Sequence, residues 1–219
     1  MIPRNTGLIV AMDVELGLDR LKGLAREIYE YVDAFKLGWY QLLTIGPGGI
    51  AEFSRDVGKY VLVDIKLGDV GHVNSYVVSK LGRLGVNGVI MHAVAGEPNV
   101  RQAVDEAKRI GLDIFLLVSM SMGGEIYDKY LEDNVKMGLR LGVAGFIAPA
   151  TKPNIIKAVR GLAGDRQILA PGVGPQGGKP GCAIASGADF EIVGRLIVGS
   201  GNPRLQAMNL VEAIRRPSC

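Results

Sequence analysis

The sequence predicts an α/β protein with a single (β/α)₈ barrel domain over residues 1–219. Three observations support this: eight short apolar runs rich in β-branched residues, regular spacing between them, and amphipathic helical patterns in the intervals. The runs begin 22 to 31 residues apart, which leaves room for a helix and two loops. They lack a clean apolar–polar alternation, so we expect parallel strands buried on both faces. An open, doubly wound sheet has similar periodicity and is the alternative.

Each predicted strand is an apolar run bounded by glycine or polar residues. In chain order the strands are Gly7–Met12, Ala34–Leu37, Tyr60–Ile65, Gly88–His92, Ile114–Val118, Gly145–Ile147, Gln167–Ala170 and Phe190–Val193. Between them, apolar side chains recur with the spacing of one helical face. These helical stripes are Leu21, Leu24, Ala25, Ile28 and Val32; Val73, Val77, Leu81 and Leu84; Val100, Ala103, Val104, Ala107 and Ile110; Ile156, Val159 and Leu162; and Met208, Val211, Ala213 and Ile214. We interpret each stripe as a face packed on the sheet.

The composition argues against several classes of protein. The net charge is +3, from 25 basic and 22 acidic side chains without a basic block, so no nucleic-acid partner is expected. The N-terminal apolar run Leu8–Met12 is too short for a signal peptide or a membrane span, so we expect a soluble, cytoplasmic protein. Cys182 and Cys219 are too few for a disulfide framework, which fits a reducing compartment. With His72 and His92 they offer no metal-ligand spacing.

Charged residues gather where the predicted strands end, which is where barrel enzymes place their chemistry. Asp64 and Lys66 end the third strand, and Asp69 follows. Asp64 and Lys66 are two residues apart and share one strand face, while Lys36 lies in the neighbouring strand. Buried charges are costly unless they are paired. We interpret the array as a preorganised electrostatic site with Lys66 as proton donor; a structural charge network at the barrel mouth is the alternative.

A glycine-rich loop follows the seventh predicted strand. Pro171–Gly181 holds five glycines and three prolines, and Gly194 and Arg195 end the eighth strand. Barrels commonly bind phosphate at the loops after these two strands, and arginine grips phosphate through two parallel hydrogen bonds. The glycine-rich loop and the Gly194–Arg195 pair together predict a phosphate site. A mobile surface loop beside a solvated arginine is the alternative.

Four other residues receive simpler interpretations. His92 has apolar neighbours and is interpreted as a core histidine. Ser121 has no general base nearby in the sequence, so we expect it to hydrogen-bond a ligand rather than act as a nucleophile. Lys152 is interpreted as a loop charge and Cys182 as a helix-packing residue.

Six segments together resemble the orotidine 5′-phosphate decarboxylase family in its compact archaeal form. They are Leu8–Asp13, Phe35–Gly38, Asp64–Asp69, Leu116–Ser121, Pro171–Gly178 and Ile192–Arg195. The resemblance covers nearly the whole chain. It implies decarboxylation of orotidine 5′-monophosphate to uridine 5′-monophosphate, the last step of de novo pyrimidine biosynthesis. It also implies a homodimer with shared active sites, and neither a metal nor another cofactor.

The resemblance assigns a role to each member of the charge array. Lys66 is similar to the lysine that protonates C6 of the pyrimidine, and Asp64 to the aspartate beside the substrate carboxylate. Lys36 resembles the lysine that holds Asp64 and touches the ribose. Asp69 resembles the aspartate contributed across the dimer interface, and Asp13 a ligand of a ribose hydroxyl.

Further substrate contacts are implied in the same way. Ser121 resembles the contact to the pyrimidine amide edge, and Val70 and Val73 are expected at the substrate as well. A further set of residues resembles the family's phosphate-binding site and the loop that closes over it. The set is Pro171, Gly172, Val173, Gly174, Gln176, Gly177, Gly178, Gly194 and Arg195.

Four positions depart from the family pattern. Val73 stands where a threonine is usual, which removes a hydroxyl but leaves a backbone N–H. Gly71 and His72 replace a Pro-Glu-like pair, and Leu196 replaces a small polar residue.

Two other functions remain as alternatives. Magnesium-dependent sugar-phosphate enzymes of the same superfamily share the Asp-x-Lys-x-x-Asp pattern, but they tend to carry glutamate at the position of Lys36. A non-catalytic barrel that binds a phosphate ligand is the second alternative, although it would not need the buried charges.

Overall fold

The computed structural model describes residues 1–219 as a closed barrel of eight parallel strands. The strands are β1 (Leu8–Ala11), β2 (Ala34–Gly38), β3 (Tyr60–Leu67), β4 (Gly88–His92), β5 (Asp113–Leu117), β6 (Gly145–Ile147), β7 (Gln167–Pro171) and β8 (Phe190–Val193). Each strand pairs with its neighbours in sequence, and β1 pairs with β8 to close the circle. The predicted barrel is therefore confirmed, and the open doubly wound sheet is wrong.

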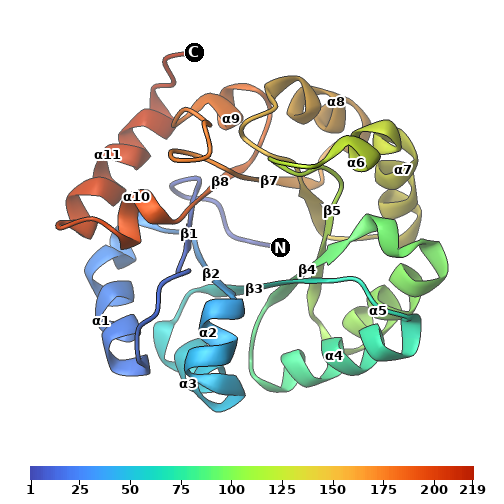
Figure 1. Ribbon diagram of the computed structural model, residues 1–219, viewed down its shortest axis with the longest axis horizontal. Helices are drawn as coiled ribbons and strands as arrows, with labels where there is room; N and C mark the ends of the chain where they lie inside the picture. The colour runs from blue at the N-terminus through green and yellow to red at the C-terminus, as the bar shows by residue number, and fades with distance from the viewer.

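Helices form a ring outside the strands, as Figure 1 shows in the view down the barrel. They are α1 (Leu18–Ile28), α2 (Trp39–Thr44), α3 (Gly46–Val57), α4 (Gly71–Arg83), α5 (Glu97–Ile110), α6 (Glu125–Lys129), α7 (Leu131–Leu141), α8 (Pro153–Ala163), α9 (Cys182–Ala185), α10 (Arg195–Val198) and α11 (Pro203–Arg215), with 3₁₀ turns η1 (Tyr29–Tyr31) and η2 (Ala93–Ala95). No helix is long and apolar enough to cross a bilayer.

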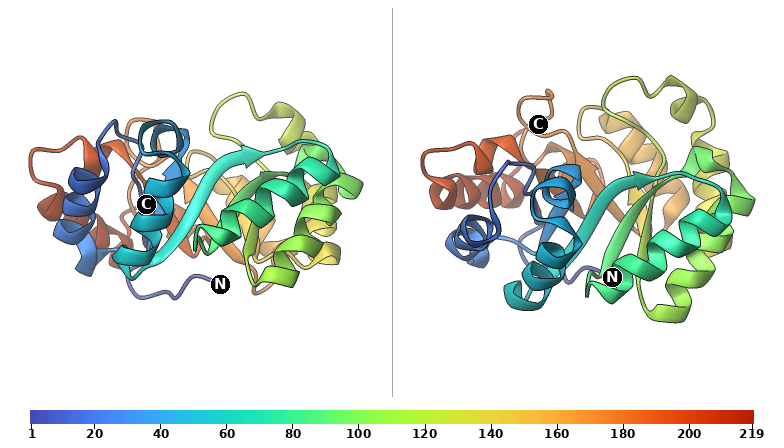
Figure 2. Two further views of the ribbon diagram at one scale, coloured as in Figure 1. Left: turned by 90° about the horizontal axis from the view of Figure 1, so that it is seen from below. Right: turned by 60° about the horizontal axis from the view of Figure 1, so that its bottom comes forward.

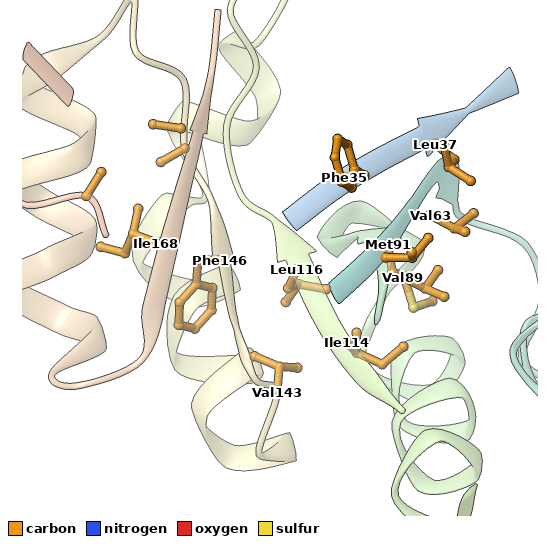
Figure 3. Packing of buried hydrophobic residues seen from close by; sticks show 14 of the residues in the cluster. Phe35, Leu37, Val63, Val89, Met91, Ile114, Leu116, Val143, Phe146 and Ile168 are labelled. Atoms are coloured by element: carbon orange, nitrogen blue, oxygen red, sulfur yellow. The ribbon is translucent and has the colours of Figure 1, made fainter. Parts of the chain in front are cut away.

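Alternate residues of each strand enter two separate cores, because successive side chains of a strand point to opposite faces. Phe35 and Leu37 of β2 belong to the large cluster between strands and helices, part of which Figure 3 shows. The ring of Phe35 packs edge-on against Phe53 of α3, with centroids 5.9 Å apart. Ala34 belongs to the smaller cluster inside the barrel. The same alternation turns Lys36 inward.

The N-terminal end of the barrel is closed by the chain's own first residues. Ile2 is buried in the inner cluster, and its backbone N–H and C=O both hydrogen-bond the side chain of Gln167. The amino group of Met1 forms an ion pair with Asp113. In Figure 2 the N-terminus lies at the opposite end from the long loop after β5. The first residues of the chain therefore cover the barrel core at the end opposite the strands' carboxyl ends.

The C-terminal residue is covalently attached to the fold. Cys182, the first residue of α9, is buried as a packing residue would be, but it also forms a disulfide with Cys219, which runs against the expectation of a reducing compartment. Two cysteines 37 residues apart meet because the loop before α9 packs against the end of α11. A Cβ on Gly181 would lie only 2.3 Å from the carbonyl oxygen of Ala213. Sequence spacing alone does not report that contact.

Candidate functional site

A cavity of about 440 Å³ opens at the carboxyl ends of the strands. That volume lies in the ordinary range for small-molecule sites. Its inner wall is apolar and comes from four strands: Ile90, Leu117, Ile147 and Ile192. Its polar wall contains the predicted residues Asp13, Lys36, Asp64, Lys66, Ser121, Gln176, Gly194 and Arg195, together with Pro171, Gly172 and Val173. The structure therefore brings most of the predicted site residues into one pocket.

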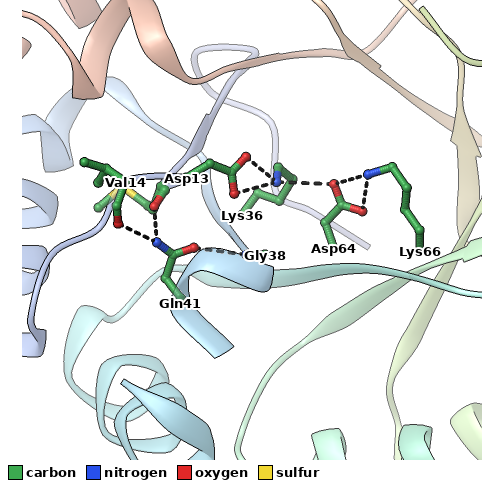
Figure 4. Close-up of polar contacts among 8 residues, drawn as sticks. Asp13, Val14, Lys36, Gly38, Gln41, Asp64 and Lys66 are labelled. Carbon is green, nitrogen blue, oxygen red and sulfur yellow. Dashed lines mark hydrogen bonds and ion pairs between the residues drawn. The ribbon is translucent and has the colours of Figure 1, made fainter. Parts of the chain in front are cut away.

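Four charged side chains of alternating sign form a continuous row along one wall. Lys36 Nζ lies 3.0 Å from Asp13 Oδ2 and 3.2 Å from Asp64 Oδ2. Lys66 Nζ then lies 3.0 Å from each carboxylate oxygen of Asp64. Figure 4 shows the row running from the end of β1 across β2 to β3. Two acids and two bases thus neutralise one another without any group from solvent.

The row keeps its inner members charged. Burial alone would lower the pKa of Lys36, but the negative charges of Asp64 and Asp13 outweigh it and raise that pKa. Burial alone would raise the pKa of Asp64, but the positive charges of Lys36 and Lys66 outweigh it and lower that pKa. Lys36 is a cation and Asp64 an anion throughout the neutral range.

Lys66 has an unusual backbone conformation. It is the only non-glycine residue with positive φ, at 48°. The pairing of β3 with β4 shifts register between Val63 and Leu67, so a bulge surrounds Lys66. The side chain is 41% exposed and faces the cavity. A strained conformation of this kind is commonly found where a side chain must be aimed at a ligand.

Asp69 does not join the row of charges in its own chain. It lies exposed in the loop after β3, where its carboxylate accepts a hydrogen bond from Val70 N at 2.7 Å. The buried side chain of Asn74 holds the backbone of Asp69, accepting from its N–H at 3.0 Å and donating to its C=O. Val70 and Val73 are also absent from the cavity wall. Asp69 and Val70 are exposed, and Val73 is half-buried outside the cavity.

The glycine-rich loop folds back on itself over the cavity. Gly178 N donates to Gly172 O at 3.0 Å, and Gly174 N donates to Gly178 O at 2.8 Å. A Cβ on Gly178 would lie 2.7 Å from Gly172 O, so only glycine fits there. Gly174, Gly177 and Gly178 form this turn without lining the cavity. Beyond the turn, the Ser121 hydroxyl donates to Gln176 Oε1 at 2.6 Å, which joins the loops after β5 and β7.

Arg195 supplies an unpaired positive charge on the same side of the cavity. It follows β8 as the first residue of α10, and no carboxylate lies within ion-pair distance of its guanidinium. Its charge is available to an anion near the glycine-rich loop. The cavity thus contains a neutralised charge row after β1, β2 and β3 and a free cation after β8.

The surroundings of the site refine two simpler interpretations. Lys152 is no free loop charge, because its Nζ lies 2.6 Å from Asp128, which also accepts from the buried Ser119 hydroxyl. His92 is half-buried and hydrogen-bonds the Tyr127 hydroxyl through Nδ1. Burial, and then the charge of Lys66, lower the pKa of His92.

Sequence reasoning missed the apolar wall of Ile90, Leu117, Ile147 and Ile192 and two residues of α2. Tyr40 of α2 lines the cavity, and the buried Gln41 beside it contacts the backbone around Asp13. Neither residue could be found from the sequence, because the short helix α2 has no periodic pattern of apolar residues that would show which side chains are buried. No cluster of three or more His, Cys, Asp or Glu side chains that could hold a metal ion occurs in residues 1–219.

Comparison with known proteins finds the same family from sequence and from structure. Residues 6–210 match the model of the Orotidine 5′-phosphate decarboxylase / HUMPS family. A curated protein of Methanosarcina mazei named orotidine 5′-phosphate decarboxylase is 35% identical over 215 residues, covering 97% of this chain and 96% of the relative. A curated protein of the same name from Thermoplasma volcanium is 35% identical, covering 95% of this chain and 93% of the relative.

Two solved structures have the same architecture over their full length. The orotidine 5′-monophosphate decarboxylase of Methanocaldococcus jannaschii, complexed with inhibitor BMP, superposes with a TM-score of 0.89 at 28% identity. That match covers 99% of this chain and 100% of the other. The orotidine 5′-phosphate decarboxylase of Pyrococcus horikoshii OT3 superposes with a TM-score of 0.84 at 31% identity, covering 95% and 99% of the two chains.

Proposed function

The chain belongs to the orotidine 5′-phosphate decarboxylase / HUMPS family, and on that premise we propose the reaction that its cavity performs. It is a carboxy-lyase that converts orotidine 5′-monophosphate to uridine 5′-monophosphate in pyrimidine biosynthesis. The observation that carries this assignment is the row Asp13–Lys36–Asp64–Lys66 on the cavity wall. A biosynthetic step of this kind is the reason to place the protein in the cytoplasm, which also remains a proposal.

Lys66 is the proton donor of the proposed mechanism. The bond between C6 and the carboxylate carbon breaks, the electron pair stays on C6, and CO₂ leaves. The ammonium of Lys66 stabilises the developing negative charge and then transfers its proton to C6. Its position supports this role, because Nζ reaches into the cavity while two 3.0 Å contacts to Asp64 fix its direction.

Asp64 acts on the substrate carboxylate. Its pKa is lowered, so it stays anionic beside the carboxylate that must leave. The negative charge of Asp64 destabilises the bound substrate carboxylate relative to neutral CO₂. The apolar side chains Ile90, Leu117 and Ile192 form the adjoining wall, where a planar ring can lie away from water. In such surroundings electrostatic effects are larger than in solution.

Arg195 and the glycine-rich loop bind the phosphate. The guanidinium has no acidic partner in the chain, and Gln176 lies on the same side of the cavity. Ser121, which contacts Gln176, is assigned to the pyrimidine edge. Phosphate binding far from C6 can then supply free energy for closing the loop over the ring.

Lys36 supports a reaction without a metal ion. Its Nζ lies between the carboxylates of Asp13 and Asp64, at 3.0 and 3.2 Å, and forms an ion pair with each. A magnesium ion prefers oxygen ligands, and in this chain a fixed ammonium occupies the place between the two candidate carboxylates. The magnesium-dependent sugar-phosphate enzymes of the family are therefore the second candidate, favoured only by the shared Asp64–Asp69 pattern.

Asp69 completes the site of a partner in the proposed homodimer. Its carboxylate is exposed beside Val70 and outside its own cavity. Large apolar side chains are also exposed on the helices that follow the neighbouring strands β2 and β3: Trp39 and Leu43 on α2, and Tyr76 on α4. Exposed large apolar side chains of this kind are typical of an interface between subunits.

The dimer can be tested by mixing two inactive variants, Lys66→Ala and Asp69→Ala. In a mixed dimer one site carries both substitutions and the other carries neither. A 1:1 mixture that exchanges subunits should regain about a quarter of the wild-type activity, because half of the dimers are mixed. No recovery, although exchange is verified by mass, would contradict a shared site.

The reaction is tested by ultraviolet absorbance of orotidine 5′-monophosphate with EDTA-treated protein. Conversion to uridine 5′-monophosphate without added metal is the expected result. Turnover that requires added magnesium would overturn metal independence. Activity on sugar phosphates with magnesium, and none on the nucleotide, would favour the second candidate.

A further inference from the structure

Gln41 is a buried amide to which the proposed mechanism gives no task. It lies on α2 and is only 1% exposed. Its Oε1 accepts a hydrogen bond from Gly38 N at 3.2 Å. Its Nε2 donates to Val14 O at 3.1 Å and also to Met12 O. Figure 4 shows the carboxamide between the end of β1 and the start of α2.

These hydrogen bonds hold backbone groups close to both residues of the Asp13–Lys36 ion pair. Met12 and Val14 are the two neighbours of Asp13, so Gln41 holds the backbone on both sides of that aspartate. Gly38 lies two residues after Lys36, so the same carboxamide also holds the end of the strand that carries the lysine. One side chain therefore fixes both partners relative to each other.

The space around this contact is tight. A Cβ on Gly38 would lie 2.8 Å from Asp13 Oδ1. The carboxylate thus packs directly on the backbone that Gln41 holds. If the carboxamide is lost, this backbone can move, and a displacement of about 1 Å from a catalytic geometry can cost about a hundredfold in rate.

We propose that Gln41 is a positioning residue, which holds Asp13 and Lys36 in the geometry needed to bind ribose hydroxyls and to orient Asp64. The inference rests on the proposed function, because it assumes a substrate that carries a ribose. Gln41 acts only through the backbone and touches neither the substrate nor the reacting atoms.

The first test compares Gln41→Leu with a matched variant, Gln167→Leu. The Gln167 side chain also bonds backbone, at Ile2 N and O, but at the closed end of the barrel. We expect Gln41→Leu to lower kcat/KM for orotidine 5′-monophosphate at least about tenfold, with both a lower kcat and a higher KM. Gln167→Leu should keep wild-type kinetics at a temperature where both variants are folded.

The second test uses Gln41→Glu, which keeps the acceptor for Gly38 N and loses the donor for the two carbonyls. Protonation of the glutamate restores one O–H donor. The ratio of its kcat/KM to that of the wild type should therefore rise as the pH falls, by up to about tenfold per pH unit until the carboxyl is protonated. A residue that only stabilises the fold would leave this ratio flat.

The outcomes separate the two proposals. An inactive wild type would overturn the proposed function and this inference with it. An active wild type with unchanged kinetics in Gln41→Leu would overturn this inference alone. If Gln41→Leu does not fold, the pH profile of Gln41→Glu decides: a rising ratio supports positioning, and a flat ratio overturns it.

Discussion

The carboxylate of Asp64 accepts two hydrogen bonds of 3.0 Å from Lys66, although only one residue separates them on β3. A flat strand would place both side chains in parallel on one face. The bulge between Val63 and Leu67 and the positive φ of Lys66 depart from this flat geometry, and the ammonium lies within hydrogen-bond distance of both carboxylate oxygens. The ammonium can therefore contact both the aspartate and a ligand in the cavity.

Lys66→Ala should abolish turnover and retain ligand binding. Loss of a general acid that also stabilises charge should lower kcat by at least about a thousandfold. Affinity for uridine 5′-monophosphate should change little, because Arg195 and the glycine-rich loop are intact. Stopped assays and isothermal titration measure the two quantities, with Lys136→Ala, an exposed cation paired to Glu132, as the control. Substantial turnover in Lys66→Ala would remove it from the donor role.

Asp64 should make the protein's stability sensitive to acid. The pKa of this carboxyl in the folded state lies below its ordinary 3.8, since its pairing with Lys36 and Lys66 outweighs burial. The stabilisation is present above the unfolded-state pKa and is lost as the pH falls through the folded value. Denaturant unfolding between pH 7 and 3 should show a steeper acid loss for the wild type than for Asp64→Asn. If the free energy of unfolding of the two proteins falls equally with pH, the pKa of Asp64 is not lowered.

Lys36, in the same row of charges, should make the protein's stability sensitive to alkaline pH. The pKa of Lys36 is raised above its ordinary 10.5, because the carboxylates of Asp64 and Asp13 outweigh burial. Its stabilisation is present below the unfolded-state pKa and is lost as the pH rises through the folded value. Lys36→Met should therefore unfold with less dependence on pH above 10.5 than the wild type does. If the stability of Lys36→Met falls with alkaline pH as steeply as that of the wild type, the ion pairs of Lys36 do not raise its pKa.

Arg195→Ala should impair only substrates that carry a phosphate. Hydrogen bonds to charged groups contribute about 1.5–3 kcal/mol, which corresponds to about a 10- to 150-fold loss of kcat/KM for the nucleotide. The slower turnover of orotidine, which has no phosphate, should stay at its wild-type value. Arg204→Ala, which removes an exposed arginine paired to Glu30, is the matched control. Equal losses on nucleotide and nucleoside would place Arg195 elsewhere in the mechanism.

Cys219→Ser should destabilise the protein and leave its chemistry intact. The disulfide to Cys182 closes a loop across 37 residues, and cross-links of this kind contribute about 2–4 kcal/mol to the free energy of unfolding. Denaturant unfolding of the wild type with dithiothreitol should reproduce the variant. Identical unfolding of oxidised and reduced wild type would show that the bond contributes nothing to stability.

Local patterns in the sequence were sufficient for the eight strands and for the five helices α1, α4, α5, α8 and α11, but they gave no helical stripe for the other six helices, including the long α3 and α7. All eight strands occur where apolar runs predicted them, with ends shifted by only a few residues. The largest extension is β3, which continues past the predicted end at Ile65 to Leu67. A bulge supplies that extension, and it has no periodic signature because it depends on the register with β4.

The sequence by itself determined the eight βα units and the charged residues at the strand ends, because these follow from local periodicity. Closure of the strands into a barrel rather than an open sheet was decided by the tertiary structure. Only the tertiary structure decided that Lys36 bridges Asp13 and Asp64, that Gln41 braces them, and that Cys182 meets Cys219. Each of these relationships joins residues far apart in the chain. Their distances are set by how strands and loops pack side by side, which no pattern within one segment encodes.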